Sequence, residues 1–328
     1  MALTEYGDIS PRTAAYAAKE LLERAIPYMV IEKFANVEPL PERSSKVIKF
    51  RRYNPLPPAT TPLTEGVTPA STKLTFTDIT ATLNQYGSLI EITDVVEDTH
   101  EDPVLKEAVK ILSEQAAVTI ETMRYNIIKA GTSVIYAGGA TSRSDVVGTL
   151  GSTEVRRATR FLKAQNARPI TEIVRSTAAY GTQNIAPSYI AICHPDLEAD
   201  LRQISTYIPA EKYGTISPWE NEIGACEGVR FLTSTIFEPW RGAGSTTTTG
   251  KLATSGRCDV YPVIVFGKDA FGIVPFKGKT AVTPTVINTV PSKSDPLGQR
   301  GSAGWKTMQT AVILQDLYMV RLEVAVSA

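Results

Sequence analysis

This sequence has few of the residues on which catalytic and metal sites are usually built. It contains two histidines, His100 and His194, and three cysteines. Neither histidine has the neighbours of a zinc site, and Cys193 beside His194 cannot supply four ligands by itself. A small, odd number of cysteines also argues against a disulfide framework and fits a reducing compartment. We therefore expect no metal site and no disulfide scaffold.

Net charge and long apolar runs are missing as well. Lys+Arg and Asp+Glu are 34 each, so no overall positive field attracts nucleic acid or an acidic membrane. No apolar run approaches the ~18 residues needed to cross a bilayer. The first ten residues also lack the basic-then-apolar layout of a signal peptide. The sequence thus predicts a folded protein that is made in a cytoplasm and has no membrane partner.

The sequence contains no complete motif of phosphate binding or of covalent catalysis. Five residues separate each of two Gly-Lys pairs, Gly250-Lys251 and Gly278-Lys279, from the glycine before it. In a phosphate-binding loop four residues separate the two glycines. No G-x-S-x-G elbow occurs, and no spacing of carboxylates singles out an acid–base pair. We expect no catalytic residues, no cofactor and no enzymatic activity.

The strongest pattern lies between Asp102 and Gly131 and predicts one long helix. Asp102 can cap the first turn, Pro103 suits the first helical position, and Gly131 is expected to end the helix in a left-handed conformation. Apolar residues recur at three-and-four spacing, which indicates one buried stripe: Leu105, Val109, Leu112, Ala116, Ile120, Met123 and Ile127. Several charged residues, Glu121 and Arg124 among them, are expected to lie largely away from it. At 1.5 Å per residue the helix would be roughly 42 Å long.

Residues 45–95 predict a long ribbon of strands. Residues 46–53, 73–83 and 86–93 have strand composition, and residues 54–72 between the first two contain five prolines. A connection this long is unusual inside a domain, and a two-stranded ribbon is marginally stable alone. We therefore favour support from another subunit over a disordered loop. The candidate inter-subunit contacts are Arg51, Arg52, Tyr53, Glu65 and Lys73.

The remaining chain mixes helices and strands. An Ala-rich helix is predicted from Ser10-Pro11 to Pro27, either packed on its own domain or extended onto a neighbour. Residues 154–166 predict a basic amphipathic helix whose charged side is solvated. Residues 241–256 are rich in Gly, Ser and Thr and predict a flexible surface insertion without core contacts. Further elements are expected at 188–193 (strand), 196–204 (helix), 228–235, 260–267, 311–314 and 320–326 (strands).

Three fragments and the order of these elements carry a resemblance. The fragments are YIAICHPD (189–196, with Leu201-Arg202 following), EGVRF (227–231) and DPLGQRGSAGWK (295–306). With the proline-rich ribbon, the long helix and the late return to strands, the chain resembles the major capsid proteins of tailed bacteriophages. Within these it is similar to the family typified by the capsid protein of the N-four coliphage.

The resemblance implies an α+β fold of the HK97-like capsid type with five parts. They are an N-terminal arm (1–44), an extended β-loop (45–98), a peripheral domain with the spine helix (99–184, helix 102–131), an axial domain (185–290) and C-terminal strands (291–328). The extended loop would lie across an adjacent subunit. Because the chain starts directly with the arm, scaffolding is expected to be a separate protein or absent.

The function that the resemblance implies is that of a shell subunit. It would self-assemble through hexamers and pentamers into the icosahedral head, in the virion, after synthesis in the host cytoplasm. Double-stranded DNA would be held by weak non-specific contact, and portal, scaffolding or decoration proteins are further candidate partners. Two alternatives stay open: an encapsulin-type compartment shell, and a β-rich carbohydrate-binding adhesion module.

Overall fold

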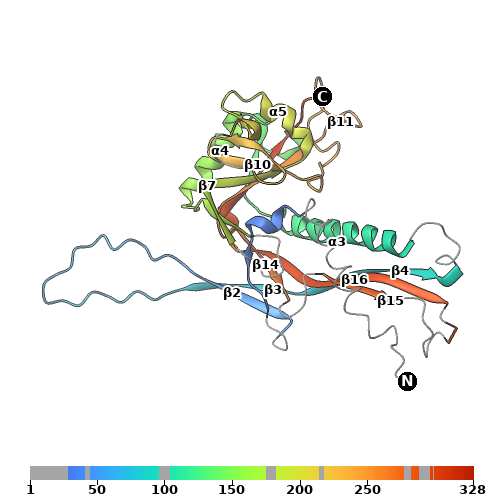
Figure 1. Ribbon diagram of the computed structural model, residues 1–328. Helices are drawn as coiled ribbons and strands as arrows, with labels where there is room; N and C mark the ends of the chain where they lie inside the picture. The colour runs from blue at the N-terminus through green and yellow to red at the C-terminus, as the bar shows by residue number, and fades with distance from the viewer. Residues whose placement is uncertain are drawn as a thin grey trace.

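The computed structural model describes residues 29–40, 45–95, 104–174, 182–213, 218–276, 282–287, 296–297 and 299–328. Figure 1 shows a lower layer with a long helix along a sheet, an upper body around a second sheet, and a two-stranded ribbon that leaves the lower layer and projects far from it. The mixed α+β class is as predicted. The helix expected between Ser10 and Pro27 lies outside the described residues.

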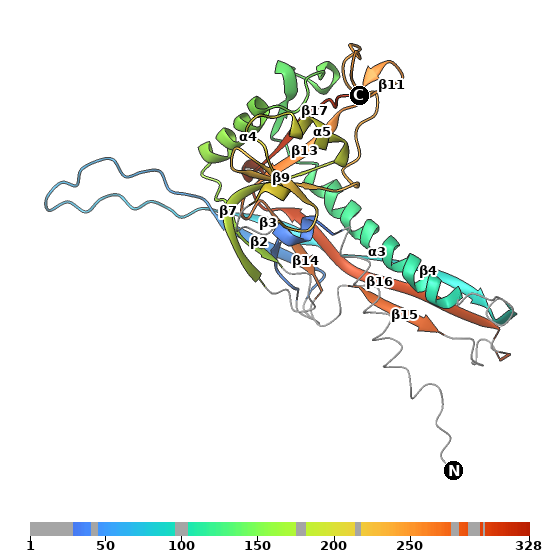
Figure 2. The same ribbon diagram turned by 45° about the horizontal axis from the view of Figure 1, so that its top comes forward.

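The long helix α3 (Val104–Ile128) is the predicted spine. Its apolar stripe is buried at Val109, Leu112, Ala116 and Ile120. The first three pack in one cluster with Trp305 and Ala303, residues of the lower sheet. Figure 2 shows α3 lying along the lower sheet. The contacts of the stripe with that sheet confirm the helix predicted from its period.

The lower sheet is centred on a strand of fourteen residues, β16 (Arg300–Ile313). One side of β16 pairs with β4 (Asn84–Thr93), and the other side pairs with β15 (Thr283–Ile287) and β14 (Phe271–Pro275), all antiparallel. β1 (Asn36–Val37) adds a parallel edge to β14. In the sequence, β14 and β15 come after strands of the upper sheet. They nevertheless belong to the lower sheet, because β16 pairs with strands along both of its edges.

The upper sheet holds the second core. Its order is β5-β17-β13-β7-β10-β9-β8, with β6 paired to β7. The bounds are β5 (Val134–Tyr136), β6 (Ile170–Val174), β7 (Thr182–Cys193), β8 (Ile208–Pro209), β9 (Glu222–Cys226), β10 (Val229–Thr233), β13 (Tyr261–Phe266) and β17 (Met319–Val324). β13 is buried throughout, as expected for a strand covered on both faces.

Two helices and several short elements complete the upper body. α4 (Ser152–Ala164) is the predicted basic helix, and Arg156, Arg157, Arg160 and Lys163 are exposed on it as expected. α5 (Glu198–Arg202) follows the turn at His194. The remaining elements are short 3-10 helices and strands: η3 (Ile31–Phe34), η4 (Ala137–Gly139), η5 (Arg143–Asp145), η6 (Pro195–Leu197), η7 (Ala210–Lys212), η8 (Asp316–Tyr318), β11 (Ala253–Thr254) and β12 (Arg257–Cys258).

The loop at residues 241–256 differs from its prediction. Gly244 is buried, with its N–H bonded to the carbonyl of Cys258, and Ser245 N–H donates to the carbonyl of Val146. Leu252 packs against the upper core. The expectation of no core contacts is wrong, because backbone bonds and one apolar side chain seat both ends of a segment whose composition is polar.

The end of α3 also differs from its prediction. Gly131 does not adopt a positive φ, so the expected left-handed ending is wrong. Instead the guanidinium of Arg321, on β17, donates to the carbonyls of Lys129 and Gly131. A cation here also opposes the negative end of the helix dipole. Arg321 therefore joins the spine helix to the upper sheet.

A buried charged cluster fixes the middle of α3. Glu121 and Arg124, predicted to lie largely away from the apolar stripe, are nevertheless buried, because residues 30–32 before β1 cover that side of the helix. Glu121 Oε1 accepts the N–H groups of Val30 (2.9 Å) and Ile31 (2.7 Å). Arg124 donates to Glu32 Oε2 at 2.6 Å. Apolar periodicity does not reveal such pairs, since their partners lie about 90 residues away.

The same guanidinium reaches the lower sheet. Its second terminal nitrogen donates to Gln309 Oε1 on β16 at 2.7 Å. The cluster thus ties residues 30–32, α3 and β16 together. Removing one partner of a buried pair leaves an uncompensated charge and costs about 3–5 kcal/mol.

The three cysteines lie in the interior of the described fold. Cys193, Cys226 and Cys258 are free and buried, and burial raises the pKa of the Cys193 thiol to about 12. The described helices include none that is both long and apolar enough to cross a membrane. No group of three or more His, Cys, Asp or Glu residues suited to a metal ion occurs among the residues the structure describes.

Burial makes the stability pH-dependent through Glu121. Desolvation raises the pKa of its carboxyl to about 7 from 4.5, opposed by Arg124 and the two backbone N–H groups, while Glu32 adds to the rise. Because the pKa is higher in the native state, the native state binds this proton more tightly than the unfolded chain does. The resulting contribution to the free energy of unfolding is full below pH 4.5 and is lost as pH rises to 7. Glu121→Gln keeps an acceptor but does not titrate. We expect it to gain stability relative to the wild type from pH 5 to 8, by on the order of 3 kcal/mol.

Thermal unfolding of dissociated subunits at four pH values in this range measures the effect. Glu211→Gln, which removes a charge from an exposed position, is the matched control and should follow the wild-type curve. A constant difference between Glu121→Gln and the wild type across the range would show that Glu121 does not titrate there.

Candidate inter-subunit surface

The ribbon is built from β2 (Val47–Tyr53) and β3 (Phe76–Thr82). They pair antiparallel in one register, with Arg51 opposite Asp78 and Tyr53 opposite Phe76. The predicted strands are therefore confirmed, with β3 beginning three residues later than expected. One face of β2 is fastened to the body, and on it Ile48 and Phe50 pack with Leu83 and its neighbours.

Arg51 and Arg52 point to opposite faces of β2 and both bind within their own subunit. Arg51 makes two bonds to the Asp78 carboxylate (2.8 and 3.0 Å), and its guanidinium lies 4.1 Å from the Phe76 ring centre. This pairing lowers the pKa of Asp78. Arg52 donates to the carbonyl of Leu314 and to the side chain of Gln315. Two predicted contact residues thus hold the ribbon together and to the body.

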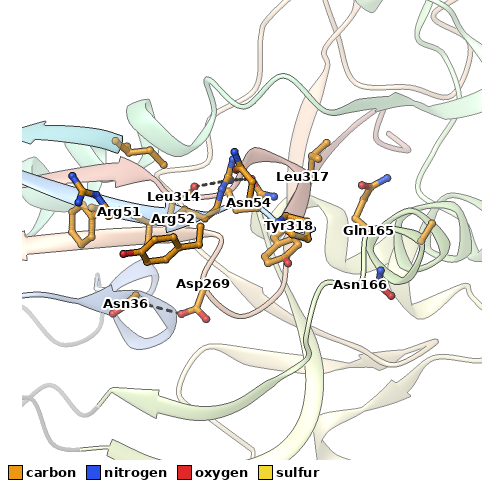
Figure 3. A pocket seen from close by; sticks show the side chains of 16 residues that line it. Asn36, Arg51, Arg52, Asn54, Gln165, Asn166, Asp269, Leu314, Leu317 and Tyr318 are labelled. Carbon is orange, nitrogen blue, oxygen red and sulfur yellow. Dashed lines mark hydrogen bonds between the residues drawn. The ribbon is translucent and has the colours of Figure 1, made fainter. Parts of the chain in front are cut away.

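A groove of about 720 Å³ lies at the root of the ribbon (Figure 3). One wall is the ribbon, including Arg52, Tyr53 and Asn54, and the opposite wall is the end of α4 with Gln165 and Asn166. Leu317 and Tyr318 of η8 close it on the body side. Its lining combines amides, aromatic rings and aliphatic side chains with the charged Arg51, Arg52 and Asp269, and such a mixture suits contact with a polypeptide segment.

The loop beyond the ribbon is exposed along its whole length. Within the described part of the chain, residues 55–74 make only two backbone hydrogen bonds, from Thr60 to Pro58 and from Val67 to Thr64. The turn at its tip uses Gly66, whose φ is +79°. Glu65 lies beside that turn and Lys73 near the start of β3, and both are exposed. The five predicted contact residues are therefore spread from root to tip and do not form one patch.

Apolar side chains on the ribbon and its loop have no cover. Leu63 and Val67 near the tip are 76% and 62% exposed. Seven of the fifteen large exposed apolar residues in the described structure lie between residues 47 and 76: Val47, Tyr53, Leu56, Leu63, Val67, Leu74 and Phe76. Concentrated apolar exposure of this kind marks a surface that another molecule covers. Of these seven, the prediction included only Tyr53. It missed Leu56, Leu63, Val67 and Leu74, which the sequence offers as isolated apolar residues among Pro and Thr.

The comparisons with known proteins agree with this architecture. Residues 77–314 match the model of a family described as "phage capsid protein". The chain belongs to the phage capsid protein family. Among curated proteins, none matches this sequence.

Solved capsids share the fold of this capsid protein. The capsid of Ralstonia phage GP4 is 10% identical over 92% of this chain and 90% of its own, with a TM-score of 0.66. The capsid of cyanophage P-SCSP1u is 15% identical over 91% and 88%, with a TM-score of 0.62. The SrpI encapsulin of Synechococcus elongatus is 8% identical over 88% and 84%, with a TM-score of 0.52. The predicted HK97-like capsid fold and the role of a structural subunit are thus confirmed.

Replacing residues 56–70 by a short Gly/Ser turn should abolish shell formation and leave the subunit folded. The segment has no ladder and no core contacts, so its loss costs the subunit little. Far-UV circular dichroism should stay native-like, and sedimentation velocity should show subunits only. As a control, replacing residues 246–249, of which Thr246, Thr247 and Thr249 are exposed, by Gly/Ser should leave shells intact. Normal shells from the 56–70 variant would mean that the loop is dispensable, and an unfolded product would place it in the subunit core.

Proposed function

We propose that this capsid protein is the major capsid protein of a tailed phage and assembles through hexamers and pentamers into an icosahedral head around double-stranded DNA. The observation that carries this proposal is the projecting loop, whose apolar side chains are left exposed by the described part of their own subunit. In a closed shell every subunit makes the same contact with a neighbour. A single type of contact, in which the neighbour covers the loop, therefore covers the loop of every copy.

The parts of the subunit are proposed with the boundaries expected from the sequence. The arm is 1–44, the extended loop 45–98, the peripheral domain 99–184, the axial domain 185–290 and the C-terminal strands 291–328. The upper sheet fits an axial domain at the capsomer centre. The lower sheet with α3 fits a peripheral domain, to which 271–287 also contribute through β14 and β15. In this scheme Glu65 and Lys73 contact the neighbouring subunit beside the apolar side chains.

The packaged DNA is proposed to be held without specific contacts. The net charge is zero, with 34 basic and 34 acidic residues. A strongly basic lining would bind DNA in a salt-dependent way and hinder its release. We place the protein in the virion, with assembly in the host cytoplasm. Portal, scaffolding and decoration proteins are further partners, and no enzymatic activity is proposed.

An encapsulin-type shell is the second candidate, and the shared fold with the SrpI encapsulin favours it. The two candidates differ in content. Particles from infected-cell lysates can be separated by density gradient, treated with nuclease and imaged by negative stain. The proposed function predicts that this chain co-bands with closed particles that contain protected double-stranded DNA. Particles that enclose a protein and no DNA would favour the encapsulin. Recovery of the chain only as dispersed monomers would contradict both.

A further inference from the structure

The strand β4 has one paired edge and one free edge. Along its paired edge β16 runs in one unbroken register over all ten residues of β4, and β16 separates β4 from β15 in the lower layer (Figure 1). Along its other edge β4 pairs with no strand among the residues that the structure describes. The backbone groups of an edge this long are a template for pairing with another chain.

Backbone bonds at both ends of β4 show which residues face the free edge. Just after β4, the N–H of Asp94 donates to the carbonyl of Gln299, so the even-numbered residues bond to the β16 side. Just before β4, the N–H of Leu83 donates to the carbonyl of Lys46 on the opposite side, where β2 lies. Successive residues of a strand alternate in direction, so the odd-numbered residues of β4 direct their N–H and C=O groups to the free edge. These residues, all exposed, are Gln85, Gly87, Leu89, Glu91 and Thr93.

The sequence of β4 has none of the features that usually keep an edge strand from pairing. Such strands carry Lys or Pro, bend at a bulge or stay short. Residues 84–93 contain neither Lys nor Pro, and Glu91 is their only charged residue. Leu89, at the middle of the free edge, is 59% exposed. The edge is therefore suited to a strand of another chain.

We propose that β4 pairs antiparallel with β4 of a second copy of this chain, about a two-fold axis at Leu89. A two-fold contact is self-complementary, so one interface covers the free edge of both copies. In this register Leu89 lies opposite Leu89 of the second copy, Gln85 opposite Thr93, and Gly87 opposite Glu91. The five odd-numbered residues then form five hydrogen-bonded pairs with two bonds each, about ten bonds in all.

The charge on β4 selects this register. When Leu89 is the centre, each Glu91 faces a glycine, and the two Glu91 residues lie roughly 13 Å apart along the strands. A register centred on Glu91 would place two carboxylates directly opposite each other, which is destabilising. A register centred on Gly87 would bring Glu91 opposite Leu83, whose N–H is already bonded toward β2. Only the centre at Leu89 uses the whole free edge.

The spine helices leave room for this pairing. Tyr86, Ile90 and Ile92, the alternate residues of β4, belong to the cluster of α3, so α3 lies on the face of the sheet away from Leu89. The same cluster contains Trp305, which places α3 over β16. Two β4 strands side by side hold the two β16 strands three strand spacings, or about 14 Å, apart. Packed helices need 8–10 Å, so the two α3 helices do not collide.

Cysteine cross-linking of the purified full-length chain tests the register. On mild oxidation Leu89→Cys should give covalent dimers, because the two Cα atoms of a hydrogen-bonded pair lie about 5.5 Å apart, within the range of a disulfide. Glu91→Cys, on the same exposed edge, is the matched control. It should give at least tenfold fewer dimers, because its two copies lie roughly 13 Å apart. The native cysteines are buried.

The pairing rests on the proposed function in that the second copy is a neighbouring shell subunit, so sedimentation velocity on the same sample shows whether shells form. Shells in which Leu89→Cys gives no dimers would overturn the pairing and leave the proposed function standing. Dimers without shells would support the pairing and contradict the proposed function, and the absence of both would contradict both. Equal cross-linking by Leu89→Cys and Glu91→Cys would also overturn the pairing.

A proline variant tests the backbone bonds. The double variant Gln85→Cys with Thr93→Cys should cross-link two chains, and adding Leu89→Pro should lower this cross-linking at least tenfold. Proline removes an N–H that faces the free edge, so the ladder with β16 keeps its bonds and thermal unfolding of dissociated subunits should stay near that of the double variant. Leu89→Thr, which keeps the N–H, is the control and should cross-link normally. Cross-linking that Leu89→Pro leaves unchanged would overturn the pairing.

Discussion

The loop between β2 and β3 carries apolar side chains that the described part of its own subunit leaves exposed. Fully burying a Leu or Val side chain is worth about 1.5–3 kcal/mol, whereas an exposed ion pair contributes about 0–1 kcal/mol. Contacts of Leu56, Leu63, Val67 and Leu74 would therefore outweigh those of Glu65 and Lys73. The five prolines of the loop reduce the backbone entropy that it loses when a neighbour orders it. Ordering a loop of this kind costs little backbone entropy. Most of the free energy that stabilises its ordered state comes from contacts with a partner.

An extended loop holds a defined position on a neighbouring subunit only if its root is rigid. Arg51 locks the two strands to each other, and Arg52 fastens them to the segment after β16. From β16 the connections continue through Gln309 and Arg124 to α3, and from the end of α3 through Arg321 to the upper sheet. Charged hydrogen bonds thus occur at these junctions, beside an apolar cluster that itself spans α3 and both sheets through Tyr125, Ile192 and Ile273. The resulting subunit is stiff at its centre and exposed at its ribbon.

The sequence predicted the elements whose pattern is local. The spine helix has a continuous apolar stripe, and the ribbon strands are bounded by prolines, so both were located within a few residues. Three features depend on contacts distant in sequence: the first was not predicted, and the other two were predicted wrongly. Glu121 and Arg124 are buried because residues 30–32 cover them, Arg321 ends α3 in place of a left-handed glycine, and backbone bonds to Val146 and Cys258 seat the loop at 241–256. Of the candidate contact residues, Arg51 and Arg52 bind inside the subunit. The sequence did not reveal these bonds, because the partners Asp78 and Gln315 cannot be recognised from spacing.

Amide hydrogen exchange of residues 55–74 tests the central claim most directly. Within the described chain this segment has two backbone hydrogen bonds of its own, so protection must come from another subunit. The account predicts exchange near the rate of an unfolded chain in dissociated subunits and strong protection of the same amides in assembled shells. Equal exchange in the two states would contradict it, because the loop would then gain no order from a neighbour.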